Sequence, residues 1–232
     1  MSFTKISKVY ELLASSSRLD MEVPQVASWL GKAKRVLDLG CGLGAHSYRL
    51  KQEYGYEMVG VDVEVAMVNE GRRRYPGLDL RLGDLCNPPE GPWDAILCLG
   101  NSVACIEREM DCSLIFSKWK AVMAPKGKCL VQWAVPPEVG EDKKVSRSDE
   151  ERSLEKSLSR TSETTYRLDL KVDFKDSSLE SIHESQRLQV LTPNEIIESF
   201  EKAGWSDSHY RPPELDVGAS HHTVETQLRG NS

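Results

Sequence analysis

Short apolar runs alternate with amphipathic stretches along residues 34–135. The runs that we predict as buried strands are 34–39, 58–61, 78–82, 93–99 and 128–135. The stretches with helical spacing of apolar side chains are 44–54, 63–75 and 110–123. Strands that are nearly continuous apolar runs, alternating with helices, indicate a parallel sheet with helices on both faces. We therefore predict a doubly wound α/β fold for this part of the chain.

The pattern changes after residue 140. Between Glu141 and Glu163, 13 of 23 residues are charged, so this stretch is expected to be a mobile surface segment. From Tyr166 to Lys175 apolar and charged residues alternate, which predicts a half-buried antiparallel strand. Residues 179–190 are expected to return beside it after a turn, so that residues 165–190 form a small antiparallel hairpin.

Clear start and stop signals frame one helix near the C-terminus. Thr192 can cap it, Pro193 suits its first position and Glu195 can complete a capping box. Gly204 provides the stop. The remaining predicted elements are strands at 205–210 and 223–228, and an N-terminal helix carrying Phe3, Ile6, Val9, Leu12 and Leu13 that is expected to lie across the sheet.

Composition and charge argue against several classes of protein. Thirty Lys and Arg against 36 Asp and Glu leave a formal net charge of −6 in 232 residues, which disfavours nucleic-acid binding. No apolar run approaches the roughly 20 residues of a membrane span, and the N-terminus lacks the apolar region of a secretory signal. The prediction is a cytoplasmic protein that binds neither nucleic acid nor a membrane. The six cysteines form no C-x-x-C pair and His221-His222 has no carboxylate at ligand spacing, so no metal site is predicted.

A glycine-rich turn follows the first predicted strand and opens the first helix. Gly40 and Gly42 allow the backbone to approach a ligand where a Cβ would collide. With Ala45 they also match the relaxed dinucleotide pattern G-x-G-x-x-A, so a nicotinamide-dependent oxidoreductase has to be considered. Asp38, two residues before the first glycine, would repel a pyrophosphate and favours a ligand that carries positive charge.

Polar residues also stand at the ends of the next three predicted strands. Asp62 ends the second strand, where a carboxylate can accept both hydroxyls of a ribose, as either cofactor would require. Asp84 follows the third strand and Asn101 the fourth. Because the carboxyl ends of parallel strands open onto one crevice, we expect a single ligand site at this edge.

Four motifs at these strand ends resemble the cofactor motifs of class I S-adenosylmethionine-dependent methyltransferases: VLDLGCGLG (36–44), VGVDVEVAM (59–67), LRLGD (80–84) and WDAILCLGNS (93–102). The resemblance covers about residues 34–106. It implies S-adenosylmethionine as the cofactor. It also implies a Rossmann-like sheet of seven mostly parallel strands with an antiparallel last strand, into which the hairpin is inserted. The expected single domain comprises an N-terminal helical cap (1–33), a cofactor-binding half (34–135), the charged segment with the hairpin lid (136–191) and a C-terminal helix and hairpin (192–232).

Two shorter motifs narrow the resemblance. CLGNS (98–102) and VYELLA (9–14) are similar to segments of the glycine and sarcosine N-methyltransferases and their small-molecule relatives. No clear match is present for the arginine that holds the amino-acid carboxylate in those enzymes, which argues against glycine itself as the acceptor. The expected activity is methyl transfer to nitrogen or oxygen of a small-molecule acceptor.

The resemblance also implies roles for individual residues at the cofactor. Gly40 and Gly42 would lie against the methionine part of the cofactor, in the electrostatic field of Asp38. Asp62 would hold the ribose hydroxyls. Val63 and Leu99 would cover the two faces of the adenine, and Asp84 with Leu85 would bind its edge.

Methyl transfer makes few demands on side chains. The reaction is an in-line displacement that depends on proximity and a dry pocket, and no residue is marked out as a necessary general base. The predicted acceptor pocket consists of Tyr10, Asn101, Trp133 and the 165–190 hairpin. Two other functions remain open: an NAD(P)-dependent oxidoreductase, and a non-catalytic S-adenosylmethionine-binding subunit that activates a partner.

Overall fold

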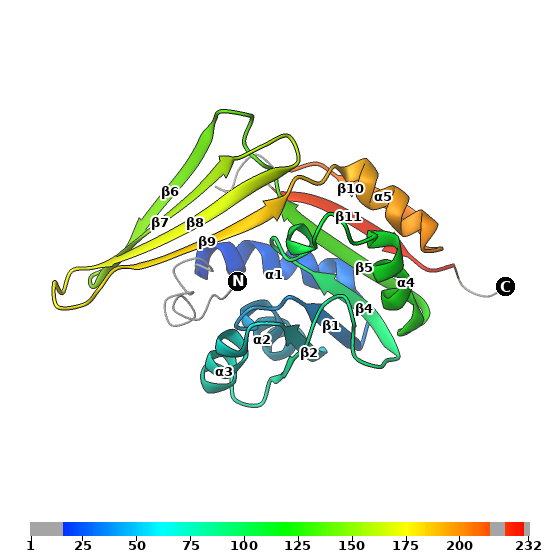
Figure 1. Ribbon diagram of the computed structural model, residues 1–232. Coiled ribbons are helices and arrows are strands. Elements are labelled where there is room, and N and C mark those ends of the chain that lie inside the picture. The colour runs from blue at the N-terminus through cyan, green and yellow to red at the C-terminus, as the bar shows by residue number, and fades with distance from the viewer. Residues whose placement is uncertain (1–15, 214–220, 230–232) are drawn as a thin grey trace.

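The computed structural model describes residues 16–213 and 221–229, and its strands form two sheets (Figure 1). Sheet A has seven strands in the order β10-β11-β5-β4-β1-β2-β3. These strands are β1 (Arg35–Leu39), β2 (Glu57–Asp62), β3 (Asp79–Leu82), β4 (Trp93–Cys98), β5 (Met123–Ala134), β10 (Ser206–Arg211) and β11 (His221–Gln227). The central pairs are parallel, whereas β11 runs antiparallel to both of its neighbours. The predicted seven-stranded sheet with an antiparallel last strand is confirmed.

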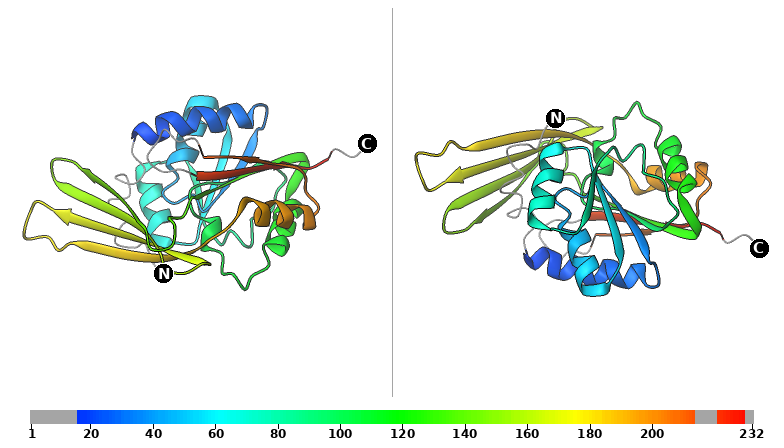
Figure 2. Two further views of the ribbon diagram at one scale, coloured as in Figure 1. Left: turned by 90° about the horizontal axis from the view of Figure 1, so that it is seen from above. Right: turned by 90° about the horizontal axis from the view of Figure 1, so that it is seen from below.

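Successive residues of a strand point to opposite sides of the sheet, so the apolar strands of sheet A present two apolar faces. Helices cover both of these faces. The helices are α1 (Ser16–Leu30), α2 (Ala45–Tyr54), α3 (Val65–Arg74), α4 (Cys112–Ala121) and α5 (Pro193–Lys202), with a short 3-10 helix η2 (Val103–Cys105). Val36 of β1 packs with side chains of α1 and α2, whereas Leu37 packs with those of α4 and α5. Figure 2 shows α1 and α2 on one face and α4 and α5 on the other. The doubly wound arrangement is therefore confirmed. Within the described residues, no helix has the length and apolar character needed to cross a bilayer.

Sheet B is larger than the predicted hairpin. It contains β6 (Asp142–Ser148), β7 (Arg152–Arg160), β8 (Thr165–Phe174) and β9 (Ile182–Gln189), paired antiparallel in that order. The prediction of a mobile segment at residues 141–163 is wrong, because most of it forms β6 and β7. Leu154 and Leu158 alternate with charged or polar residues and are buried, so a regular strand lies within the charged run. Sheet B extends away from sheet A in Figure 1.

The N-terminal region departs from the prediction in a second way. The predicted helix with Phe3 and Leu13 lies outside the described residues, as does Tyr10. The first described helix is α1, which lies within the predicted helical cap (1–33), although its bounds were not predicted. Its buried positions are Leu19, Val23, Val26, Ala27 and Leu30. That spacing is the signal that could have identified the helix. The division of the chain at residues 33, 135 and 191 stays a prediction.

The start of α5 offers a first test of the local sequence signals. The Thr192 side chain accepts from the Glu195 amide, and the Glu195 carboxylate accepts from the Thr192 amide, so the predicted capping box is present.

Thr192→Ala should lower the free energy of unfolding by about 1 kcal/mol, because one amide at the helix start loses its partner. Chemical denaturation measures this loss. Ser199→Ala, in the middle of the same helix, is the control and should cost less; an equal cost would contradict the capping assignment.

Candidate active site

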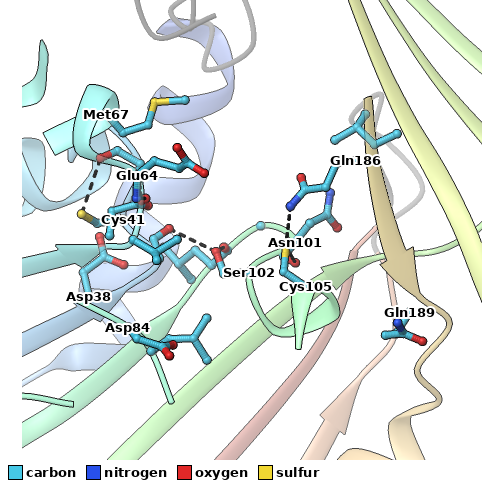
Figure 3. A pocket seen from close by; sticks show the side chains of 18 of the residues that line it. Asp38, Cys41, Glu64, Met67, Asp84, Asn101, Ser102, Cys105, Gln186 and Gln189 are labelled. Atoms are coloured by element: carbon cyan, nitrogen blue, oxygen red, sulfur yellow. Dashed lines mark hydrogen bonds between the residues drawn. The ribbon is translucent and has the colours of Figure 1, made fainter. Parts of the chain in front are cut away.

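A cavity of about 940 Å³ lies at the carboxyl ends of the central strands of sheet A. The glycine loop, residues 40–44, forms part of one wall, and residues of sheet B form part of the opposite wall. Figure 3 shows Asp38, Cys41 and Asp84 on one side, Gln186 of β9 on the other, and Asn101 between them. All eight residues predicted to contact the cofactor line this cavity: Asp38, Gly40, Gly42, Asp62, Val63, Asp84, Leu85 and Leu99.

The glycine loop is held closely against its neighbours. The amides of Gly40 and Cys41 both donate to the carbonyl of Val61, at 2.8 and 3.1 Å. The Ser102 hydroxyl donates to the Gly40 carbonyl at 3.1 Å (Figure 3). Gly40 has a φ of 72°, and a Cβ added there would lie 2.2 Å from the Ser102 hydroxyl oxygen. Glycine is therefore required at this position for both backbone conformation and space.

Asp62 anchors the glycine loop as well as lining the cavity. Its Oδ2 accepts from the Gly42 amide at 2.7 Å, and its Oδ1 accepts from the Glu64 amide at 2.9 Å. A carboxylate has about four acceptor positions, so each oxygen can accept a further hydrogen bond. Burial raises the pKa of Asp62, although the backbone amides oppose the shift. The anchoring role was not predicted from the sequence.

Asp38 is the most buried carboxylate of the cavity wall, with 2% of its surface exposed. Its Oδ2 accepts from the Ser47 hydroxyl at 2.6 Å. Burial raises the pKa of Asp38, and the neighbouring charge of Asp62 adds to the shift. Two poorly solvated carboxylates thus face the same cavity beside the glycine loop. A cationic ligand there would stabilise their charged forms.

A second polar group lies where α1 meets α2. His46 Nε2 is 2.8 Å from Glu22 Oε2, and Arg18 Nε donates to Glu22 Oε1 at 2.7 Å. Burial alone would raise the pKa of Glu22, but the contacts with His46 and Arg18 outweigh it and lower the pKa to about 2. Arg18 and His46 both line the cavity. No sequence motif marked either residue.

The predicted acceptor residues have different positions. Asn101 lines the cavity, and its Oδ1 accepts from the Ala134 amide at 2.8 Å. Trp133 does not line the cavity: it is fully buried, and its Nε1 donates to the Leu191 carbonyl at 2.9 Å. The role of Trp133 as an acceptor-pocket residue therefore stays a prediction, which its position does not support. Its side chain faces the core under the segment that leads into α5.

Sheet B lines the cavity with residues of the predicted 165–190 hairpin and with one residue outside it. Leu168 and Leu170 of β8 line the cavity, together with Lys156 of β7. Gln186 Nε2 of β9 donates to the Cys105 Sγ at 2.9 Å, which joins sheet B to η2 (Figure 3). The alternation of β8 was visible in the sequence, but which of its faces lines a cavity depends on the packing of the two sheets. In the described parts of the chain, no group of three or more His, Cys, Asp or Glu residues is placed to hold a metal ion.

Comparisons with known proteins agree with this arrangement. Residues 36–127 match the family model described as "Methyltransferase domain". Over 116 residues the chain is 30% identical to dTDP-4-amino-2,3,4,6-tetradeoxy-D-glucose N,N-dimethyltransferase of Saccharopolyspora spinosa, covering 49% of this chain and 46% of that protein. Over 102 residues it is 32% identical to glycine/sarcosine N-methyltransferase of Parasynechococcus marenigrum (strain WH8102), covering 41% of this chain and 36% of that protein. The chain thus matches less than half the length of these curated relatives.

Solved structures extend the similarity of fold over nearly the whole chain. An amino pentose methyltransferase from Micromonospora echinaspora superposes with a TM-score of 0.77 at 22% identity, covering 98% of each chain. DesVI from Streptomyces venezuelae superposes with a TM-score of 0.80 at 17% identity, covering 97% of this chain and 98% of that one. Sheet B and the C-terminal strands are therefore part of a shared fold.

Proposed function

We propose that this protein is a class I S-adenosylmethionine-dependent methyltransferase, which binds its cofactor between the glycine loop and Asp62 and transfers a methyl group to nitrogen or oxygen of a small-molecule acceptor. The observation that carries the proposal is the poorly solvated carboxylate of Asp38 beside the glycine loop. A sulfonium cofactor with an ammonium group is compatible with that charge, whereas the pyrophosphate of a nicotinamide cofactor would be repelled. The family match over residues 36–127 supports the same choice.

The residues at the strand ends fit the parts of this cofactor. The bound cofactor supplies a methyl group made electrophilic by its sulfonium. Gly40 and Gly42 line the cavity where the methionine part would lie, and the free acceptor positions of Asp62 suit the two ribose hydroxyls. Val63 and Leu99 offer apolar surface for the two faces of the adenine, and Leu85 offers a backbone amide for its edge.

The Asp84 carboxylate already accepts from the Cys86 amide at 2.8 Å, which orients it at the end of the turn after β3. Its other acceptor positions suit the adenine amino group. Sheet B covers the cavity from the other side and reduces access of water to the transferred methyl group. These residues bind, orient and exclude water, and the proposal needs no general base among them.

An amine is the acceptor group that the relatives favour. The two curated relatives are named as N-methyltransferases, one of an amino sugar nucleotide and one of glycine and sarcosine. An amine must lose its proton before it attacks the methyl group, so we expect turnover to rise with pH as the neutral amine becomes populated. We place this activity in the cytoplasm.

Thermal unfolding with added ligands tests the proposal directly. At 100 times its dissociation constant, S-adenosylhomocysteine should stabilise the protein by about 2.7 kcal/mol, while NAD should leave it unchanged. Stabilisation by NAD alone would overturn the proposal in favour of an oxidoreductase. Methyl transfer from S-adenosylmethionine to a panel of amino sugars and small amines then separates an enzyme from a cofactor-binding subunit without turnover.

A further inference from the structure

The cavity wall formed by sheet B combines leucines with polar side chains, and its one ammonium group belongs to Lys156. Leu168 and Leu170 of β8 lie on the face of sheet B that lines the cavity. Lys156 of β7 is paired in register with Leu170, so its side chain belongs to the same face. Leu154 and Leu158, two residues to either side of Lys156, are buried on that face as well. A lysine in such a row needs a partner for its charge.

Within residues 16–213 and 221–229, Lys156 makes no hydrogen bond or ion pair. Glu184 of β9 lies on the same face of sheet B as Lys156, but Leu170 of β8 lies between the two residues. Their backbones are therefore two strand spacings apart, about 10 Å. The charged neighbours that act most strongly on Lys156 are Arg18 and Arg147, which carry the same sign. Burial first, and then these two arginines, lower the pKa of Lys156 to about 8.

Lys171, an exposed lysine of the same sheet, has a carboxylate as its partner and serves as a comparison. It lies on the opposite face of β8, and its Nζ is 2.8 Å from Asp173 Oδ2. Lys156 is more buried than Lys171 and has no such carboxylate beside it. An incoming anion would therefore offset the free-energy cost of burying its charge and the repulsion from Arg18.

Arg18 approaches the same cavity from a different element. It lies in the first turn of α1, where Glu22 orients its guanidinium, and it lines the cavity together with Lys156. Asp38 and Asp62 supply the opposite charge at the strand ends. The cavity therefore has an acidic wall beside the glycine loop and a basic group formed by α1 and sheet B.

We propose that Lys156, together with Arg18, forms a binding site for an oxyanion, a carboxylate or phosphate group of a ligand that occupies the cavity. The inference rests on the proposed function, since the ligands in question are the methyl acceptor and the cofactor. An acidic acceptor would be held by this site with its nucleophile directed toward the acidic wall, and Lys156 would then determine acceptor specificity. The carboxylate of the cofactor's methionine part has the same chemistry and is the other possible source.

Three titrations of the whole protein distinguish these sources. Wild type, Lys156→Met, Lys156→Gln and Lys156→Arg are titrated with S-adenosylhomocysteine and with adenosine, which lacks the carboxylate. The complex with S-adenosylhomocysteine is then titrated with inorganic pyrophosphate. The matched control is Lys171→Met, which removes the same charge from the outer face. Thermal unfolding verifies that each variant is folded.

If the acceptor supplies the oxyanion, Lys156→Met and Lys156→Gln should weaken pyrophosphate binding by about tenfold or more, with little change for S-adenosylhomocysteine. If the cofactor supplies it, the same variants should weaken S-adenosylhomocysteine about tenfold and leave adenosine unchanged. In both cases Lys156→Arg should retain most of the affinity and Lys171→Met all of it. The inference is overturned if folded Lys156 variants match wild type in all three titrations. A wild-type protein that does not bind S-adenosylhomocysteine would instead overturn the proposed function.

Discussion

Asp62→Ala should weaken binding of S-adenosylhomocysteine by a factor on the order of 30 to 1000. In the proposed complex the variant loses two charge-assisted hydrogen bonds to the ribose, each worth roughly 1.5–3 kcal/mol. Water fills part of the gap, so a net loss of about 2–4 kcal/mol in binding free energy is expected. The amides of Gly42 and Glu64 also lose their acceptor, which loosens the glycine loop itself.

The structure changes the expectation for Asp62→Asn. From a strand-end position alone, asparagine should be the milder change, because one of its side-chain atoms still accepts. In the structure both carboxylate oxygens accept from backbone amides. The amide nitrogen of an asparagine would therefore face another donor at Gly42 or at Glu64. Asp62→Asn should weaken binding nearly as much as Asp62→Ala.

Asp94 provides a matched control for the loss of backbone anchoring. Its Oδ2 accepts from the amides of Lys34 and Arg35, at 2.8 and 2.9 Å, at the start of β1 and away from the cavity lining. Asp94→Ala should lower the melting temperature without changing the affinity for S-adenosylhomocysteine. Isothermal titration and thermal unfolding of the three variants measure both quantities. Binding by folded Asp62→Ala within threefold of wild type would show that the cofactor is placed wrongly.

Trp133→Ala should lower the free energy of unfolding by about 3–5 kcal/mol. The indole is fully buried in the cluster that joins sheet A to α4, α5 and sheet B, and its removal leaves a cavity there. Small proteins are stable by only about 5–15 kcal/mol, so the variant should be close to unfolding at physiological temperature. Urea denaturation measures the loss.

Trp133→Phe separates the packing role from a role at the acceptor. Phenylalanine keeps an aromatic ring but leaves the Leu191 carbonyl without its indole donor, which should cost about 1–3 kcal/mol. Because the side chain does not line the cavity, affinity for S-adenosylhomocysteine and the KM for the acceptor should stay close to those of wild type. A folded Trp133→Phe protein with an unchanged stability and a raised acceptor KM would return this residue to the acceptor pocket.

Local patterns were sufficient for the strands and helices of the cofactor-binding half. Apolar runs, glycines and caps act over a few residues, so the order of elements could be predicted before any contact was known. The set of eight cofactor residues at the strand ends came from the resemblance to the methyltransferase motifs. The same holds for the capping box at Thr192, whose partners are three residues apart.

The charged segment was misjudged because its strands are stabilised by pairing with distant residues. In β7 only Leu154 and Leu158 mark the buried face, and the lysine between them carries a long aliphatic stem that can be buried beside β8. Composition measures the total charge of a segment but not which of its sides is covered. The antiparallel partner of β7 is β8, which follows it after a turn. Composition alone gives no information about this pairing.

The sequence by itself determined the class of fold and the residues that the carboxyl ends of the strands bring to one edge. Only the tertiary structure decided three other matters: that Asp62 anchors the glycine loop, that Trp133 belongs to the core, and that Lys156 lies in the cavity opposite the carboxylates. Each depends on how sheet B and the helices pack against sheet A. Periodicity defines the two faces of a strand, but only packing against distant elements decides which face becomes core and which becomes a site.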